Sequence, residues 1–164
     1  MVTIRSATYD DAEALNEIGN HYIYETPANF KTDALTIEER KSWIATFADT
    51  GRYKLLVAIE EGRVVGYAGS SPFHERAAYQ TSVSTAIYLH PRSQSKGIGS
   101  ALYSELFSLL QMEDIHRIFA GITLPNPASR AIHKKFGFRE VGIFTEAGRK
   151  CDRYWDVLWL EKHL

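Results

Sequence analysis

The sequence is poor in cysteine and has no long hydrophobic run. Its single cysteine, Cys151, cannot form a disulfide within the 164-residue chain. Unpaired cysteine is typical of a reducing compartment, so we expect a cytoplasmic protein. No run approaches about 18 uninterrupted apolar residues, and the first residues lack the apolar core of a signal peptide. A membrane protein and a disulfide-held secreted fold are therefore not expected.

An excess of charge of one sign is also lacking. The chain carries 19 Lys and Arg residues against 20 Asp and Glu residues, a formal net charge of −1. General attraction to nucleic acid or to an anionic membrane is therefore not expected. The six histidines show no metal-ligand spacing, so we expect no metal site. The apolar fraction of 45% is that of a globular protein. A single domain over residues 1–164, an enzyme or a small-ligand binder, is predicted.

Hydrophobic periodicity and turn residues predict the element order β-α-α-β-β-β-α-β-α-β-β. Capping boxes at Thr8 with Asp11 and at Thr36 with Glu39 begin the first two helices. One mixed α/β sheet with helices on both faces is the economical assembly. We expect helices at 12–24, 36–49, 98–110 and 126–136, and strands at 2–5, 54–59, 63–70, 81–89, 115–122, 139–144 and 154–160.

The most informative segment is the loop from Arg92 to Ala101, between a predicted strand and a predicted helix. Its glycines, Gly97 and Gly99, allow backbone N–H groups to converge and a ligand to approach the chain. Such amides, together with the following helix N-terminus, suit a phosphate or pyrophosphate. The loop lacks the Gly-Lys-Ser/Thr ending of a nucleotide P-loop and the third glycine of a dinucleotide fingerprint. A different diphosphate ligand is indicated, or a glycine-rich loop that binds nothing.

Two motifs resemble the GNAT N-acetyltransferases. Gln94-x-x-Gly97-x-Gly99 is similar to their acyl-CoA pyrophosphate loop, and the later segment matches the second half of their signature, Asn126-x-x-Ser129-x-x-x-His133-x-x-x-Gly137-Phe138. Nearly the whole chain resembles the phosphinothricin acetyltransferase and amino-acid N-acyltransferase branch, through Asn20-His21-Tyr22-Ile23, residues 25–30, residues 123–129 and Tyr154-Trp155-Asp156-Val157. The resemblance implies a mostly antiparallel sheet with one splayed parallel pair, and acetyl-CoA as co-substrate.

The resemblance also implies a set of acetyl-CoA contacts. The pyrophosphate loop corresponds to Gln94, Ser95, Lys96, Gly97, Ile98 and Gly99. The strand backbone that pairs with pantetheine corresponds to Ile87, Tyr88 and Leu89. Asn126 and Lys135 match further contacts. Each also has an ordinary structural explanation: the asparagine can be a helix N-cap, and the lysine can interact favourably with the helix dipole. Lys96 is either a contact or a solvated side chain.

The catalytic residues implied by the resemblance are His133 and Ser84. His133 lies where relatives place a tyrosine or histidine near the leaving sulfur, and it can protonate a thiolate or relay a proton. Relatives carry a glutamate base ten residues before Gln94, where this chain has Ser84. A hydroxyl cannot act as a general base in place of a carboxylate, except by holding a water molecule. Both the mechanism and the phosphinothricin substrate are therefore open at this point.

The remaining expectations concern the substrate. The pocket of the branch corresponds to Phe30, His74, Arg76 and Tyr79, and Arg76 can pair with a substrate carboxylate. The leading interpretation is acetyl transfer to a small primary amine, an amino acid or a phosphinothricin-like or methionine-sulfoximine-like analogue, by direct attack in a ternary complex. A protein or peptide N-acetyltransferase and a non-catalytic acyl-CoA sensor are the alternatives. A homodimer is compatible with the sequence.

Overall fold

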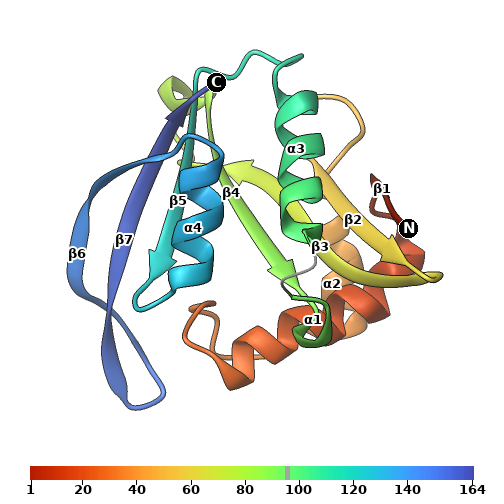
Figure 1. The fold of residues 1–164 in the computed structure, drawn as a ribbon, viewed down its shortest axis with the longest axis horizontal. Helices are drawn as coiled ribbons and strands as arrows, with labels where there is room; N and C mark the ends of the chain where they lie inside the picture. The colour runs from red at the N-terminus through yellow and green to blue at the C-terminus, as the bar shows by residue number, and fades with distance from the viewer. Residues whose placement is uncertain (95–96) are drawn as a thin grey trace.

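The computed structural model describes residues 1–94 and 97–164. Within them, one seven-stranded sheet is covered by four α-helices (Figure 1). The helices are α1 (Ala12–Glu25), α2 (Ile37–Ile44), α3 (Ile98–Leu110) and α4 (Pro127–Lys135). The strands are β1 (Val2–Ser6), β2 (Leu55–Glu60), β3 (Arg63–Pro72), β4 (Ser82–Leu89), β5 (Arg117–Thr123), β6 (Arg139–Lys150) and β7 (Arg153–His163).

The strands lie in the order β1-β2-β3-β4-β5-β7-β6. Among the described residues, β4 and β5 form the one parallel pair, and the other neighbours are antiparallel. The helices α3 and α4 cover the face turned toward the viewer in Figure 1, and α1 and α2 pack on the other face. The prediction of a mixed, mostly antiparallel sheet with one parallel pair and helices on both faces is confirmed.

The sheet separates two hydrophobic clusters. The larger one joins α3 to the sheet through fully buried Leu102 and Leu106, and the smaller one joins α1 to β2 through Leu15, Ile18 and Val57. Each such side chain contributes roughly 1.5–3 kcal/mol on burial. The periodicity at three and four residues therefore did identify the buried faces of both helices. None of the described helices is long and apolar enough to cross a membrane.

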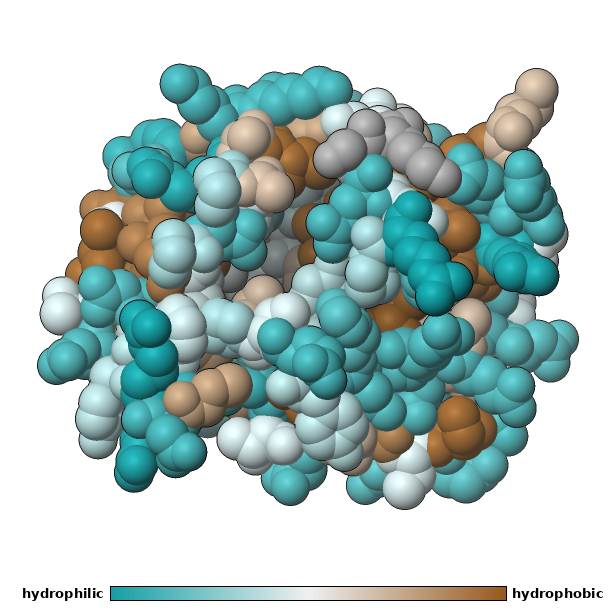
Figure 2. Space-filling model, turned by 60° about the horizontal axis from the view of Figure 1, so that its bottom comes forward, coloured by the Kyte–Doolittle hydropathy of each residue, from teal (hydrophilic) through white to brown (hydrophobic). Residues whose placement is uncertain are grey.

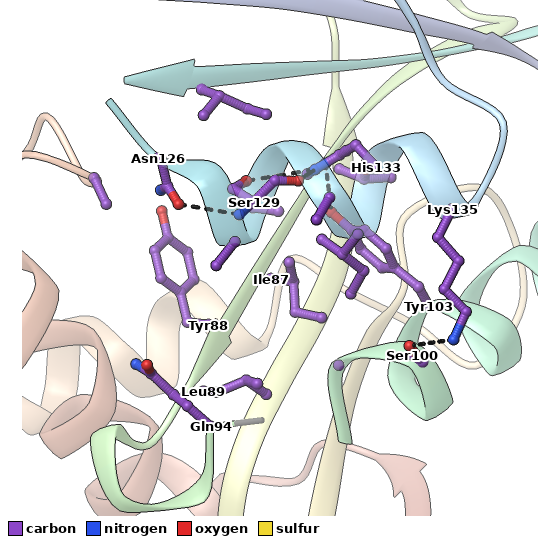
Figure 3. A pocket seen from close by; sticks show the side chains of 18 of the residues that line it. Ile87, Tyr88, Leu89, Gln94, Ser100, Tyr103, Asn126, Ser129, His133 and Lys135 are labelled. Carbon is purple, nitrogen blue, oxygen red and sulfur yellow. Dashed lines mark hydrogen bonds between the residues drawn. The ribbon is translucent and has the colours of Figure 1, made fainter. Parts of the chain in front are cut away.

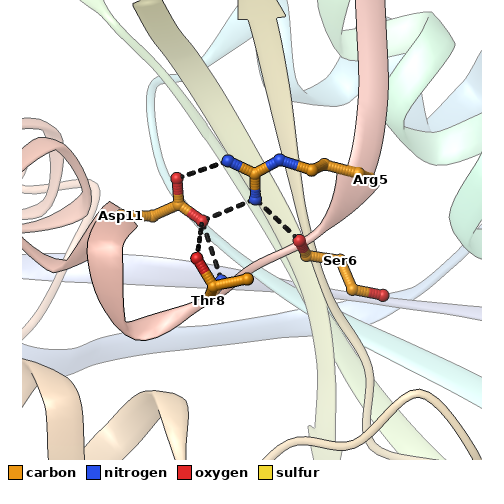
Figure 4. A network of polar contacts seen from close by, with 4 residues as sticks. All are labelled: Arg5, Ser6, Thr8 and Asp11. Atoms are coloured by element: carbon orange, nitrogen blue, oxygen red, sulfur yellow. Dashed lines mark hydrogen bonds and ion pairs between the residues drawn. The ribbon is translucent and has the colours of Figure 1, made fainter.

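The turn from β1 into α1 is held by a compact polar network (Figure 4). The Thr8 amide donates to Asp11 Oδ2 at 2.8 Å, as the capping-box pattern predicts. Both terminal nitrogens of Arg5 also donate to the Asp11 carboxylate, at 2.7 and 2.8 Å. Burial alone would raise the pKa of Asp11, but these hydrogen bonds outweigh it and hold the pKa below its ordinary value. The ionised carboxylate thus fixes the path of the chain into the first helix.

The second helix and the last two strands differ in length from the sequence prediction. The second helix was expected to reach residue 49, but α2 ends at Ile44. The Thr46 hydroxyl donates to the Trp43 carbonyl at 2.7 Å and so competes with the helical backbone bond. The last two strands are longer than predicted and form one hairpin, β6–β7. Its turn places Cys151 and Asp152 at φ of +53° and +55°, a geometry usually signalled by Asn-Gly or Asp-Gly.

Candidate functional site

The sheet opens between β4 and β5. These strands pair in parallel only from Ser82 to Ser84, opposite residues 117–119. Beyond Ser84 the described residues of β4 pair with β3 alone, as far as Leu89. A cavity of about 510 Å³ lies at the divergence, and Figure 2 shows a hollow bordered largely by polar side chains. Eight residues predicted to contact the cofactor line this cavity: Ile87, Tyr88, Leu89, Gln94, Gly97, Gly99, Asn126 and Lys135.

The N-terminus of α3 faces the cavity. Its N-cap residue, Gly97, has a φ of +79°, a left-handed conformation that favours glycine. Gly97 and Gly99 both line the cavity, so the first N–H groups of α3 and the positive end of its dipole lie where they can bind an anion. Ile98 is buried in the core and offers only its backbone. The predicted contacts Ser95 and Lys96 lie outside the described residues.

The N-terminus of α4 forms the opposite wall. Asn126 caps this helix by accepting a hydrogen bond from the Ser129 amide at 3.0 Å, and Pro127 occupies the first helical position. The Lys135 ammonium donates to the Ser100 hydroxyl at 2.8 Å and ties α4 to α3. Figure 3 shows both contacts at the cavity. Asn126 and Lys135 therefore have structural partners, and both also line the cavity where a donor substrate would lie.

His133 is a buried member of the cavity wall with both ring nitrogens engaged (Figure 3). Its Nδ1 lies 2.7 Å from the Ser129 carbonyl oxygen, which can only accept, so this nitrogen carries the hydrogen. Its Nε2 lies 3.0 Å from the Tyr103 hydroxyl. Burial lowers the pKa of His133, although the bond to the Ser129 carbonyl opposes this effect. The ring is therefore neutral at pH 7, and Tyr103 donates to Nε2.

One buried hydroxyl of the cavity is incompletely satisfied. The Thr85 side-chain oxygen makes no hydrogen bond of full geometry within the described part of the chain, although it lies close to the Tyr103 hydroxyl, and Thr85 is only 7% exposed. Buried hydroxyl groups in native proteins almost always have a partner. Together with the edge of β4 that β5 leaves unpaired, this hydroxyl offers polar contacts to an extended ligand. The cavity thus fits the arm of CoA, in which an amide-bearing pantetheine chain is joined to a pyrophosphate.

A second, smaller cavity lies on the other side of β4, beneath α1 and α2. Its volume is about 260 Å³, and Ala86 and Tyr88 line both cavities. Ser84 shares a face of β4 with these two residues because side chains alternate along a strand. Ser84 is half-buried and, among the described residues, is part of neither lining. Its hydroxyl therefore lies beside the second cavity on the face opposite His133.

The four residues predicted to bind the substrate are not among the described residues that line the two cavities. His74 and Tyr79 are neighbours with ring centroids 4.9 Å apart, and the Arg76 amide donates to the His74 ring at 3.2 Å. Phe30 lies against Gly148 of β6, where a Cβ atom would be 2.2 Å from its ring, so the glycine makes room for it.

The loop after α1 is fastened to the end of β6. The buried Lys150 ammonium donates to the carbonyls of Tyr22 at 3.3 Å, Thr26 at 2.8 Å and Asn29. Burial lowers the pKa of this lysine. Ala28 lines the large cavity and Asn29 the small one. Lys150 therefore positions a loop that borders both cavities.

Sequence reasoning missed two residues of the site. Tyr103, the partner of His133, occurs in an apolar helix where an aromatic side chain is an ordinary core residue. Arg40 lines the small cavity, and the sequence does mark its position as unusual. It occupies the row of Ile37, Ile44 and Phe47, where an apolar side chain is expected. Within the described residues, no cluster of acidic, histidine or cysteine side chains could hold a metal ion.

Comparison with known proteins agrees with this geometry. Residues 4–159 match the acetyltransferase (GNAT) domain. The chain is 46% identical to the phosphinothricin N-acetyltransferase of Streptomyces coelicolor, over 99% of this chain and 96% of that protein. It is 31% identical to the L-methionine sulfoximine/L-methionine sulfone acetyltransferase of Salmonella typhimurium, over 99% and 95%.

A solved structure resembles the fold over its whole length. The phosphinothricin acetyltransferase of Sinorhizobium meliloti, determined in complex with AcCoA, superposes with a TM-score of 0.94 at 31% identity. The match covers 99% of this chain and 88% of that one. Domain match, sequence identity and fold agree with one another, and the chain belongs to the GNAT family of acetyltransferases.

Proposed function

We propose that this chain transfers the acetyl group of acetyl-CoA to the primary amine of a small molecule. The acceptor is an amino acid or an analogue such as phosphinothricin or methionine sulfoximine. The observation that carries the proposal is that two cavities meet at β4, where Ala86 and Tyr88 belong to both. One cavity suits a long diphosphate ligand and the other a small molecule. The names of the Streptomyces and Salmonella relatives support this choice.

The large cavity would hold the donor. The N–H groups of residues 94–99 would receive the pyrophosphate, and the backbone of Ile87, Tyr88 and Leu89 would pair with pantetheine. Asn126 and Lys135 would make side-chain contacts. Bound acetyl-CoA supplies a thioester that the amine attacks directly in a ternary complex. Donors fixed along β4 would stabilise the developing oxyanion through their geometry.

The acceptor must reach the thioester as a neutral amine. No Asp or Glu side chain lines either cavity among the described residues. An α-amino group has a pKa of about 7.7–8.0, so roughly a tenth is neutral at pH 7, whereas a lysine side chain at about 10.4 is neutral only a few times in ten thousand. Losing a base worth about 10²–10⁴ in rate is thus tolerable for an α-amine. A water molecule held by Ser84 or His133 would take the proton.

Thiol release from acetyl-CoA tests the proposal. The panel contains methionine sulfoximine, phosphinothricin, free amino acids and a lysine peptide, with an N-acetylated amino acid as the control that lacks a free amine. We expect turnover with free α-amines. Turnover with the peptide alone would show a protein acetyltransferase, and acetyl-CoA binding without any turnover would show a sensor. The rise of the rate with pH should have an apparent pKa near that of the substrate amine. An apparent pKa near 6 that His133→Ala abolishes would contradict direct attack by an amine that is already neutral.

We also propose a cytoplasmic homodimer that binds neither nucleic acid nor membrane. The lone cysteine and the net charge of −1 support the compartment and the lack of these partners. Support for the dimer comes from the edge strand β6, where Val141, Ile143 and Phe144 are each more than half exposed. Sedimentation velocity should give twice the 18.6 kDa chain mass. Ile143→Asp should shift the protein to a monomer, and a monomeric wild type would contradict the proposal.

A further inference from the structure

A buried arginine of the small cavity has no acidic partner. Arg40, on α2, is 4% exposed and forms no ion pair with any described residue. Its Nε donates to the Asn16 side-chain oxygen at 3.3 Å, and its guanidinium carbon lies 4.8 Å from the Trp43 ring centre. The Tyr67 hydroxyl is a further hydrogen-bond partner of the guanidinium. All of these partners are neutral side chains, so no anion among the described residues balances the positive charge of Arg40. Buried charges are normally paired, so this one lacks a counter-ion.

The fold keeps space open for this guanidinium. Gly19 lies in the interior of α1, where glycine is less favourable than alanine. A Cβ atom at Gly19 would be 2.5 Å from Arg40 Nη2 and 3.2 Å from the Tyr67 hydroxyl. Any side chain at this position would displace the arginine head group. The glycine thus allows the charge to remain buried next to the cavity.

The lining of the small cavity suits an anion with an apolar body. Its two charged residues among those described are both cations, Lys31 and Arg40, and it contains no carboxylate. The aromatic rings of Trp43, Phe47 and Tyr67 supply much of the remaining wall. A volume of about 260 Å³ corresponds to roughly nine water molecules at about 30 Å³ each, the scale of a small amino acid. A free amino acid carries the matching carboxylate.

The position of this cavity links it to acetyl transfer. Ala86 and Tyr88 separate it from the large cavity and line both. A carboxylate held at α2 would therefore leave the rest of a bound amino acid between α2 and β4. The α-amine would lie toward β4, on the face that also carries Ser84.

We propose that Arg40 binds the carboxylate of the acceptor amino acid, and that this contact selects carboxylate-bearing amines. The inference rests on the proposed function, since it names the acceptor group that the small cavity recognises. A guanidinium can hold a carboxylate through two parallel hydrogen bonds, which fixes orientation as well as affinity. Arg40 thereby takes the role that the sequence comparison suggested for the exposed Arg76.

The test compares L-methionine sulfone with its carboxamide, using both calorimetric binding and acetyl transfer. We expect Arg40→Gln to weaken binding of the amino acid at least about tenfold, while binding of the carboxamide changes less than about threefold. Arg63→Gln, an exposed arginine in the β2–β3 hairpin, is the matched control. Equal effects on the two ligands would overturn the inference. Loss of discrimination in Arg76→Gln in place of Arg40→Gln would also overturn it.

Two further measurements separate the possible failures. Thermal melting and the acetyl-CoA dissociation constant report whether Arg40→Gln folds and retains the large cavity. If Arg40→Gln does not fold, the wild type still tests the inference, because the wild type must bind the amino acid at least about tenfold more tightly than the carboxamide. Wild-type binding with this preference but without turnover refutes the proposed function and supports the carboxylate site. Turnover without any preference for the carboxylate refutes the site alone.

Discussion

The hydrogen bond between Tyr103 and His133 can be removed by one substitution, Tyr103→Phe. The change deletes only the hydroxyl, because the ring contacts of Tyr103 with Phe107, Phe136 and His133 are made by the aromatic ring. His133 Nε2 would then be a buried acceptor without a donor. Leaving such a group unsatisfied costs about 1–3 kcal/mol. At roughly 2–4 °C per kcal/mol for a chain of this size, the melting temperature should fall by about 2–12 °C.

The pair also has a pH signature. Because burial lowers the pKa of His133, the unfolded chain binds a proton more readily than the native one. The stability contributed by the neutral ring is present above the unfolded pKa of about 6.5 and is lost as pH falls toward the folded pKa. The slope that one group can contribute is at most about 1.4 kcal/mol per pH unit. His133→Gln should lack this component.

Thermal and urea unfolding at pH 8, 7, 6 and 5 measure both effects. Nitrogen NMR of the imidazole reports independently whether Nδ1 carries the hydrogen at pH 7. A Tyr103→Phe melting temperature within 1 °C of wild type at pH 8, together with unchanged imidazole shifts, would refute the assigned pair. A wild-type ring protonated at pH 7 would refute the reasoning from burial.

Three further predictions concern single contacts. Asn126→Ala removes a helix N-cap and should cost about 1 kcal/mol in thermal unfolding, with weaker acetyl-CoA binding by calorimetry if the side chain also contacts the donor. Asp11→Asn breaks the bond to Arg5, and since the Asp11 pKa is lowered, the stability it removes should be present above about pH 3.9 and vanish at lower pH in urea titrations. Lys150→Met leaves loop 26–30 without its donor, and faster amide exchange there is expected; unchanged exchange would contradict the anchoring role.

Much of the fold is encoded locally, where propensity and pattern agree. The turn Glu60-Glu61-Gly62 does form the predicted hairpin, with Glu61 and Gly62 at φ of +51° and +76°. Gly137, with φ of +80°, ends α4 as expected. The lengths of α2 and β6 escaped prediction because a side-chain bond from Thr46 and tertiary pairing along the hairpin decide them. Local sequence carries neither interaction.

The candidate site also has a part that sequence motifs predict and a part that they do not. The predicted contacts to acetyl-CoA depend on backbone amides, glycines and a cap, all of which have sequence motifs, and eight of those predicted residues do line the large cavity. The proposed contacts to the acceptor depend on side chains from separate elements, which only folding brings together. Arg40 lines the small cavity, and its head group fits beside Gly19 of another helix because Gly19 lacks a side chain. No spacing rule connects those two positions.

The three-residue seam between β4 and β5 has a consequence for cooperativity. Together with the hydrogen bonds that the His116 and Arg117 amides donate to the neighbouring Thr81 carbonyl, it is the strand pairing that joins the β1–β4 half of the sheet to the β5–β7 half. A molecule lodged in the large cavity touches both halves and so bridges them. A ligand at a hundred times its dissociation constant adds about 2.7 kcal/mol of stability. Hydrogen exchange should therefore slow on both sides of the seam at once when acetyl-CoA binds, and the two half-sheets should then unfold as one unit.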